Sequence, residues 1–364
     1  MSTSNMNPGL QAKSPPTFEF SVGHSTRRAK WKRRVKTLPG LIVAFFLTWL
    51  LLPALLVAAG VHDLLRNRRF SATRLILFGA WWLAMELLGV FTAFLFWLTF
   101  APFRKLDSKT SRRCHSHLQR VWARSLARGA QFTIGFQWSA EGTECLHSPG
   151  AIIVLARHGS QGDALLTAAL LSGERRRLRF VLKRQLLADP CLDVVGHRIP
   201  NYFVDRDSTD NRGELANIGS LAADLESDEA LVIFPEGTRF SPQKLTAALT
   251  TLSQTAPSRA AATRNLRSVL PLRTAGTLAA LAASDADIVV CNHVGIDDIS
   301  SLRHLRDSVP LKNPLKFKLW RTSRDNLPEA WSEDQLVQWL DNQWLDVDQW
   351  VTANDTRTSP DAGH

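Results

Sequence analysis

A histidine and an aspartate five residues apart lie where an apolar run gives way to a helical pattern, in the segment VLARHGSQGDALL. If His158 ends a strand and Asp163 begins a helix, the two side chains can meet across a turn. Gly159 and Gly162 suit such a turn. The carboxylate would then accept the Nδ1 proton of the histidine and leave Nε2 as a general base. A simpler interpretation stays open, because Ser160 and Asp163 also have the spacing of a helix capping box.

A second polar group follows another apolar run, in the segment FPEGTRFS at residues 234–241. Pro235 ends the run, Gly237 allows an unusual turn, and Arg239 carries a planar guanidinium suited to phosphate. Ligands of open α/β sheets bind at the carboxyl ends of strands, so we expect the two polar groups to meet there. A charged surface loop would show the same residue types, and neither group decides the chemistry alone.

Short apolar runs alternate with helical patterns along the rest of the chain. Strands are expected at 151–156, 179–183, 202–205, 230–235, 268–272 and 287–292, and helices at 163–172, 211–226, 243–254 and 274–284. The runs are apolar throughout rather than alternating, which is typical of a parallel sheet covered on both faces. The sequence therefore predicts an α/β fold with a mainly parallel sheet flanked by helices.

Two long apolar segments precede this region, at 41–59 and 75–100. Each is long enough for a membrane helix of about 20 residues. Basic residues flank the pair on both outer sides, which favours the cytoplasmic side of the membrane for these flanks and for the domain that follows. Four arginines also lie between the segments, so a shallow hairpin that never crosses the bilayer stays open as an alternative.

These patterns divide the chain into four parts: a disordered and then basic segment at 1–37, two membrane helices at 38–103, a catalytic domain at 104–352 and a disordered tail at 353–364. The domain is expected to start with a basic helix at 108–131 near the bilayer. Its last helix is expected to begin at Ser332, where Gln335 completes a capping box. Apolar residues of that helix should face the core and its aspartates should face away.

Positive charge is concentrated at the beginning of the chain. The net charge is +11, and the first 128 residues hold 20 of the 44 Lys and Arg but only 4 of the 33 Asp and Glu. A uniformly basic protein would suggest nucleic acid, whereas this local excess matches the membrane segments, so no nucleic-acid partner is expected. The four cysteines stand apart at 114, 145, 191 and 291, without zinc-site spacing, so no metal is expected.

Taken together, the two polar groups resemble the motifs of the glycerolipid acyltransferase superfamily. His158 and Asp163 match its His-x4-Asp motif, and residues 234–239 match its Pro-Glu-Gly-Thr-Arg motif in full. Between them, YFVDRD resembles a block that ends in a basic residue, here Arg206. VLPLRTAG resembles a fourth block, and the last helix resembles the tail of lysocardiolipin acyltransferases. The resemblance covers roughly residues 120–350.

The resemblance implies transfer of a fatty acyl group from a thioester to a free hydroxyl of a lysophospholipid, most simply 1-acyl-glycerol-3-phosphate, in phospholipid biosynthesis. His158 and Asp163 would be catalytic, and the substrate-binding residues would be Arg206, Glu236, Gly237, Thr238 and Arg239. The donor would be acyl-CoA or an acyl carrier protein thioester, membrane lipids would be partners, and no cofactor is implied. Arg157 departs from the family pattern, where Asn is frequent, and so does Pro200, where Gly is expected.

Three alternatives are left open by the residues. The acceptor could be another lysophospholipid, such as lysocardiolipin or lysophosphatidylinositol. Arg157, His158 and Gly159 after a strand also match a histidine phosphatase with His293 as its second histidine, although Asp163 and FPEGTR would then be unexplained. The third alternative is a membrane scaffold with the same fold and no activity.

Overall fold

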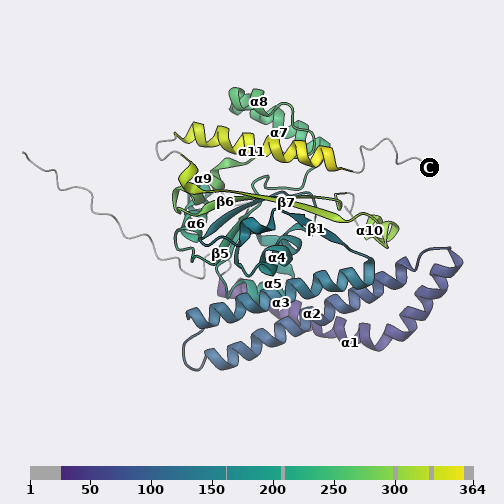
Figure 1. The fold of residues 1–364 in the computed structure, drawn as a ribbon. Coiled ribbons are helices and arrows are strands. Elements are labelled where there is room, and N and C mark those ends of the chain that lie inside the picture. The colour runs from purple at the N-terminus through teal and green to yellow at the C-terminus, as the bar shows by residue number, and fades with distance from the viewer. Residues whose placement is uncertain (1–25, 161, 206–209, 298–301, 328–331, 356–364) are drawn as a thin grey trace, which may run out of the picture.

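The computed structural model describes residues 26–160, 162–205, 210–297, 302–327 and 332–355 of the chain. A seven-stranded sheet lies at the centre, with helices on both of its faces (Figure 1). The predictions for the two ends of the chain, and the one for Arg206, lie outside the described residues. The division into four parts stays a prediction.

The sheet has the strand order β1–β7–β6–β2–β5–β3–β4. Five neighbouring strands are parallel: β6 (Asp287–Val294), β2 (Ile152–Ala156), β5 (Glu229–Ile233), β3 (Arg177–Lys183) and β4 (Tyr202–Val204). At the other edge, β7 (Leu315–Thr322) is antiparallel to β6 and β1 (Trp138–Glu141) is parallel to β7. The predicted α/β fold with a mainly parallel sheet is confirmed.

Helices cover both faces of the sheet, which is why its central strands are apolar throughout. One face packs against α3 (Lys109–Ile134) and α4 (Asp163–Gly173), with the short α5 (Pro190–Gly196) beside them. The other face packs against α6 (Asn211–Ala223), α9 (Thr274–Ala282) and α11 (Glu333–Asn354). Figure 1 shows α7 (Pro242–Thr255) and α8 (Pro257–Thr263) on the outer side of α11, and α10 (Leu302–Ser308) near one end of β7.

The two long apolar helices form the outermost layer on the α3 side. Both α1 (Arg27–Leu65) and α2 (Ser71–Phe100) are long and apolar enough to cross a membrane, judged by length and composition alone. The helix α2 lies along α3, and α1 lies outside α2 (Figure 1). Trp81 Nε1 donates to the carbonyl oxygen of Ser125 at 2.9 Å, and Trp122 Nε1 donates to Glu86 at 3.1 Å. These bonds tie α2 to α3 near its middle.

Both ends of this hairpin are also attached to the sheet domain. Near the start of α1, Arg33 and Arg34 form ion pairs of 2.6 and 3.0 Å with the buried carboxylate of Asp193 in α5. At the turn between α1 and α2, Arg68 forms an ion pair of 2.9 Å with Asp307 in α10. The hairpin therefore contacts the domain at the start of α1, along α2 and at the turn.

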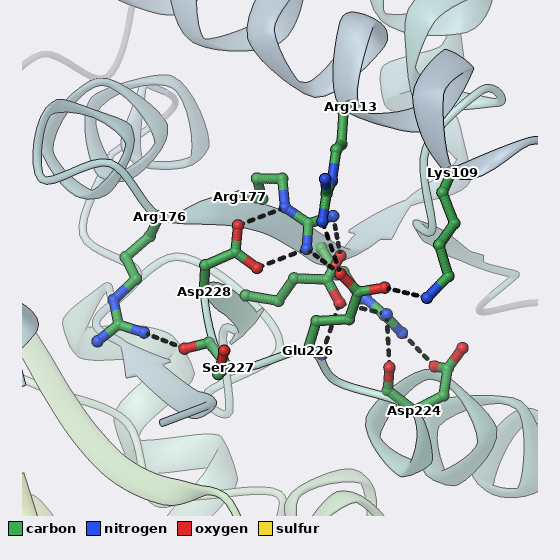
Figure 2. A network of polar contacts seen from close by, with 10 residues as sticks. Lys109, Arg113, Arg176, Arg177, Asp224, Glu226, Ser227 and Asp228 are labelled. Carbon is green, nitrogen blue, oxygen red and sulfur yellow. Dashed lines mark hydrogen bonds and ion pairs between the residues drawn. The ribbon is translucent and has the colours of Figure 1, made fainter. Parts of the chain in front are cut away.

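A partly exposed ion-pair network fixes α3 to the amino ends of β3 and β5 (Figure 2). Arg177 contacts Glu226, Asp228 and Glu229. Lys109 and Arg113 of α3 approach Glu226 at 3.2 and 3.6 Å. Each exposed ion pair contributes little to the stability of the fold, so the network stabilises the fold mainly through the number of its pairs.

The segment 268–272 is not a strand, so that prediction is wrong. Its backbone N–H groups bond to carboxylates instead of to a neighbouring strand: Ser268 and Val269 donate to Asp348, and Leu270 donates to Glu236. The strands β1 and β7 were not predicted. In β7 the apolar residues alternate with lysines, and β1 is short and mostly exposed, so neither shows the continuous apolar run of the central strands.

The last helix begins as predicted, with a complete capping box between Ser332 and Gln335. Its apolar side chains pack on the sheet, and Trp344 is 1% exposed. The prediction that its aspartates face away is wrong for two of them. Asp348 is buried and accepts the N–H groups of 268–269, and Asp341 is buried in an ion pair of 2.6 Å with Arg259.

Candidate active site

The two polar motifs meet at the carboxyl ends of β2 and β5, which are neighbours in the sheet. The chain leaves β2 towards His158 and leaves β5 towards Glu236. The N–H of Phe240 donates to the carbonyl oxygen of His158 at 3.0 Å, and the rings of Phe234 and His158 lie 5.3 Å apart. The expected meeting of the two groups at this end of the sheet is therefore observed.

The side chains of His158 and Asp163 are in contact, as the sequence predicts. Nδ1 of His158 lies 3.0 Å from Oδ2 of Asp163. An ionised carboxylate only accepts hydrogen bonds, so Nδ1 carries the proton and Nε2 keeps a lone pair. Asp163 is also the first residue of α4, but Gly162 is the N-cap and makes no side-chain cap. Ser160 and Asp163 therefore form no capping box at the start of α4, although Asp163 both starts the helix and faces the histidine.

Ser160 contributes two further donors to Asp163. Its N–H donates to Oδ2 at 2.8 Å, and its hydroxyl donates to Oδ1. Asp163 is fully buried, which by itself raises its pKa, but the nearby His293 and the hydrogen bonds from His158 lower the pKa well below its ordinary value. Asp163 is therefore an ionised carboxylate at neutral pH.

His158 is the more accessible partner, with a side chain that is 15% exposed. Burial lowers its pKa below the ordinary value of 6.5, against the hydrogen bond and charge of Asp163, which raise it. The positive charges of Lys183 and Arg239 lower it further. The imidazole is consequently neutral at neutral pH, which is the protonation state that a general base requires.

Glu236 braces the site. It is 2% exposed, and its two carboxylate oxygens accept the N–H of His158 at 2.8 Å and the N–H of Leu270 at 2.9 Å. Burial raises its pKa to about 7, although Arg157 and these two N–H donors lower it. With both oxygens bonded to the backbone, Glu236 connects the two motifs to the segment 268–272 and has little surface left for a substrate.

Arg157 is the residue whose importance the sequence did not indicate. Its side chain is fully buried, and it donates to the carbonyl oxygens of His293 at 2.7 Å and Ser268 at 3.1 Å. It also forms an ion pair of 2.7 Å with Asp297. Arg157 therefore joins the loop of His158 to the end of β6 and to the segment 268–272, and the only signal for this was its departure from the family pattern.

Gly159 lies in the connection between β2 and α4, as predicted, and its lack of a Cβ also allows a close contact. A Cβ at this position would lie 2.3 Å from Oδ1 of Asp297 and 2.7 Å from Nη1 of Arg157. Such distances are too short for real Cβ atoms. The glycine thus allows the buried Arg157–Asp297 ion pair to approach the backbone.

The other predicted binding residues lie in the turn after β5. Gly237 has φ of +70°, a left-handed conformation that favours glycine, and Thr238 accepts a hydrogen bond from Lys244 at 3.1 Å. Arg239 is half-buried and makes no ion pair with any described residue, while its charge acts on His158. Arg206 lies outside the described residues, so its prediction stays untested.

An apolar cavity of about 980 Å³ adjoins the loop of His158. Ser160 and Gly162 form part of its wall, and most of the remaining wall consists of apolar side chains from α2, α3, α4 and β3. Leu75 and Phe78 of α2 are among them, so the helix α2 of the hairpin forms one side of the cavity. Among the residues that the structure describes, no group of three His, Cys, Asp or Glu could hold a metal ion.

Comparisons with known proteins agree with this geometry. Residues 138–275 match the family model described as Acyltransferase. No curated protein sequence matches the chain at a significant level. Among solved structures, the chain is similar to the crystal structure of the 1-acyl-sn-glycerophosphate (LPA) acyltransferase, PlsC, from Thermotoga maritima, with 16% identity and a TM-score of 0.45, over 75% of this chain and 98% of that chain. Residues 138–275, which contain both motifs, therefore match the Acyltransferase family, and this match supports the resemblance of the motifs to the glycerolipid acyltransferases.

Proposed function

We propose that the chain transfers a fatty acyl group from an acyl thioester to a free hydroxyl of a lysophospholipid, with 1-acyl-glycerol-3-phosphate as the acceptor. The observation that carries this proposal is the buried pair of His158 and Asp163 at 3.0 Å, placed beside an apolar cavity of about 980 Å³. The pair supplies a base for a hydroxyl, and the cavity supplies an apolar environment for a fatty chain.

The proposed reaction needs no covalent enzyme intermediate, because a thioester is already activated. Nε2 of His158 takes the proton of the acceptor hydroxyl while its oxygen attacks the thioester carbonyl carbon. The tetrahedral intermediate then collapses, the carbon–sulfur bond breaks, and the thiolate takes the proton from His158. The charge of Asp163 stabilises the imidazolium between these steps. Such acid–base assistance is worth roughly 10²–10⁴ in rate.

Arg239 is the proposed partner of the acceptor phosphate. Its guanidinium makes no ion pair with a described residue and lies close enough to His158 to lower the pKa of that histidine. Lys183, at the end of β3, acts on His158 in the same way. A phosphate bound here would bring the glycerol hydroxyl of the same molecule near Nε2. Charge-assisted bonds from arginine to phosphate are among the stronger polar interactions in proteins.

The hairpin of α1 and α2 is proposed to lie in one face of the membrane rather than to cross it. The helix α2 contacts α3 from Arg74, which donates to Thr133, to Phe96, whose ring lies 5.2 Å from that of His115. Were α2 to span the bilayer, the arginines along the middle of α3 would enter hydrocarbon, at a cost of at least about 2.5 kcal/mol each. A hairpin that lies at the membrane interface leaves these arginines at the lipid head groups. It also turns the α2 side of the cavity towards the lipid.

An acyl-transfer assay tests the proposed reaction. The full chain in membranes receives acyl-CoA and 1-acyl-glycerol-3-phosphate, with lysocardiolipin and lysophosphatidylinositol as competing acceptors. His158→Ala and Asp163→Asn should each abolish most of the transfer. His147→Ala is the matched control, because His147 is exposed and pairs only with Glu174 in the described structure. Full activity of both site variants would refute the mechanism, and preference for another acceptor would correct the substrate.

A phosphate-labelling experiment separates the phosphatase alternative. A histidine phosphatase would retain labelled phosphate on His158, and its second histidine would have to face the same phosphate. In the structure Asp163 lies between the two histidines, 3.0 Å from Nδ1 of His158 and 3.1 Å from Nε2 of His293. This arrangement does not support a shared phosphate site. Labelling of His158 by a phosphomonoester would overturn that conclusion.

A thiol-labelling experiment tests the position of the hairpin. Arg28→Cys and Arg66→Cys place exposed thiols at the two ends of α1. In sealed vesicles that carry the domain on their outer side, a reagent that cannot cross membranes should label both positions at similar rates. The unmodified chain gives the background from its own cysteines. Labelling of Arg66→Cys only after the vesicles are lysed would show that α1 spans the bilayer.

A further inference from the structure

A second buried histidine lies on the opposite side of Asp163 from His158. His293 belongs to β6, is 1% exposed, and its Nε2 lies 3.1 Å from Oδ1 of Asp163. Its ring packs edge-on against that of Phe317, with 5.8 Å between the ring centres. The family motifs do not include this position. Its place beside Asp163 comes from the pairing of β6 with β2, which brings together residues 130 positions apart.

A polar side chain at this buried position needs an explanation, because burying an imidazole without hydrogen bonds costs free energy of folding. Neither ring nitrogen of His293 has a hydrogen-bond partner of standard geometry within the described residues, so Asp163 provides the nearest charged contact. Since a carboxylate only accepts, the proton of a neutral His293 belongs on Nε2 and points towards Oδ1. A leucine or phenylalanine would fill the same space without the cost. The histidine is therefore best explained by what it does to Asp163.

The contacts of Asp163 divide evenly between its two oxygens. Oδ2 faces Nδ1 of His158 and the N–H of Ser160, and Oδ1 faces the hydroxyl of Ser160 and Nε2 of His293. Without His293, the serine hydroxyl would be the one remaining donor at Oδ1 among the described groups. The carboxylate could then rotate and lose its alignment with His158. An error of about 1 Å in such an alignment can cost a hundredfold in rate.

We propose that His293 is a positioning residue of the acyl-transfer site, which holds the carboxylate of Asp163 so that Oδ2 faces His158. This inference rests on the proposed function of His158 and Asp163. His293 does not touch the substrate in this role, and it acts through Asp163 alone.

The experiment compares His293→Leu with His293→Gln, whose side-chain amide can again donate near the position of Nε2. His293→Leu should lower kcat about tenfold or more with little change in the KM of either substrate. It should also shift the acid limb of kcat/KM to lower pH, because a misaligned carboxylate loses part of the hydrogen bond and charge contact that raise the pKa of His158. His293→Gln should recover most of the rate and return the limb towards its original position.

His115→Leu is the matched control, since His115 is also 1% exposed but lies in α3 and bonds to the carbonyl oxygen of Ser111. It should lower thermal stability without moving the acid limb. The inference is overturned if His293→Leu behaves like this control, or if His293→Gln is no better than His293→Leu. The outcome for the proposed function is separate, because that function fails only if His158→Ala keeps full activity.

Discussion

The two ends of the central sheet both gather arginines and carboxylates, but they use them in opposite ways. At the amino ends of β3 and β5, the Arg177 guanidinium contacts three carboxylates, and Glu226 is reached by Lys109 and Arg113 as well (Figure 2). At the carboxyl ends of β2 and β5, Arg157 forms one ion pair, with Asp297. The first end is a partly exposed network in which the charged groups share partners, and the second is buried, with Asp297 as the one carboxylate that pairs with Arg157 among the described residues.

This difference predicts how the two ends respond to the loss of one charged side chain. In a shared network, the loss of one charge leaves its partners with other neighbours and with water. In a buried ion pair such as Arg157–Asp297, the loss of one partner leaves a charge without compensation, which costs far more than the pair contributed. The end that carries the proposed chemistry should therefore be the more fragile one, both in stability and in activity.

The largest effect is expected for Arg157→Met. The change leaves the Asp297 carboxylate buried without its cation, and removes the donors to the carbonyl oxygens of His293 and Ser268. The folded state should lose about 3–5 kcal/mol. Acyl transfer should fall sharply, because Arg157 also fixes the loop of His158. Thermal unfolding in detergent and the acyl-transfer assay measure the two effects, and a loss of stability below that of Arg177→Met would contradict the comparison.

A smaller effect is expected for Gly159→Ala. The new Cβ would meet the Arg157–Asp297 pair at 2.3 to 2.7 Å, and the pair or the loop must move. Overpacking of this kind costs about 1–3 kcal/mol. The rate should fall while the KM values change little. Gly173→Ala in α4 is the control, because nothing lies within 4 Å of a Cβ there, and an equal fall in rate for both variants would argue against a specific clash.

The features that the sequence predicted are those that depend on neighbours along the chain. The central strands, the contact of His158 with Asp163 and the capping box at Ser332 each lie within about a dozen residues, and the residue types themselves determine them. The segment 268–272 was mistaken for a strand because it is apolar. Its backbone bonds to Glu236 and Asp348, and no local pattern reveals partners at such a separation.

The parts of the site that could not be predicted depend on the order of the strands. Arg157 meets Asp297, and Asp163 meets His293, because β6 pairs with β2. From the sequence alone, Arg157 is an unusual neighbour of the motif, and His293 has a role only in the phosphatase alternative. The types of these residues determine which chemistry they can perform. Their roles follow from the pairing of β6 with β2, which the sequence did not specify.

At the opposite end of the sheet, Arg177→Met should have a modest effect on stability and none on the chemistry. Glu229 keeps its contact with Arg179, and Glu226 keeps Lys109 and Arg113. A loss of about 1–2 kcal/mol is expected. Lys109→Ala should cost less than about 1 kcal/mol, because its side chain is 82% exposed. The activity of the folded fraction should equal that of the unmodified chain in both cases, and a change in kcat would show that the two ends are coupled.

The smallest effect on the fold, and the most informative one for the site, is expected for Arg239→Ala. The half-buried guanidinium makes no ion pair with a described residue, so stability should hardly change. The KM for the acceptor should rise about tenfold, the equivalent of one charge-assisted bond. The acid limb of kcat/KM should move as well. Burial, Lys183 and Arg239 lower the pKa of His158, so the unmodified chain should stay active below pH 6.5, until the imidazole binds a proton.

Removal of the Arg239 charge takes away one of the causes that lower this pKa. The limb should therefore shift upwards, towards 6.5, by less than about one pH unit. Arg239→Lys keeps the positive charge and should leave the acid limb of kcat/KM in place. The loss of the planar guanidinium should still raise the KM for the acceptor. The two variants thus separate the electrostatic action of Arg239 on His158 from its binding of phosphate. A limb that moves equally in both variants, or an acceptor KM that changes in neither, would remove Arg239 from the proposed site.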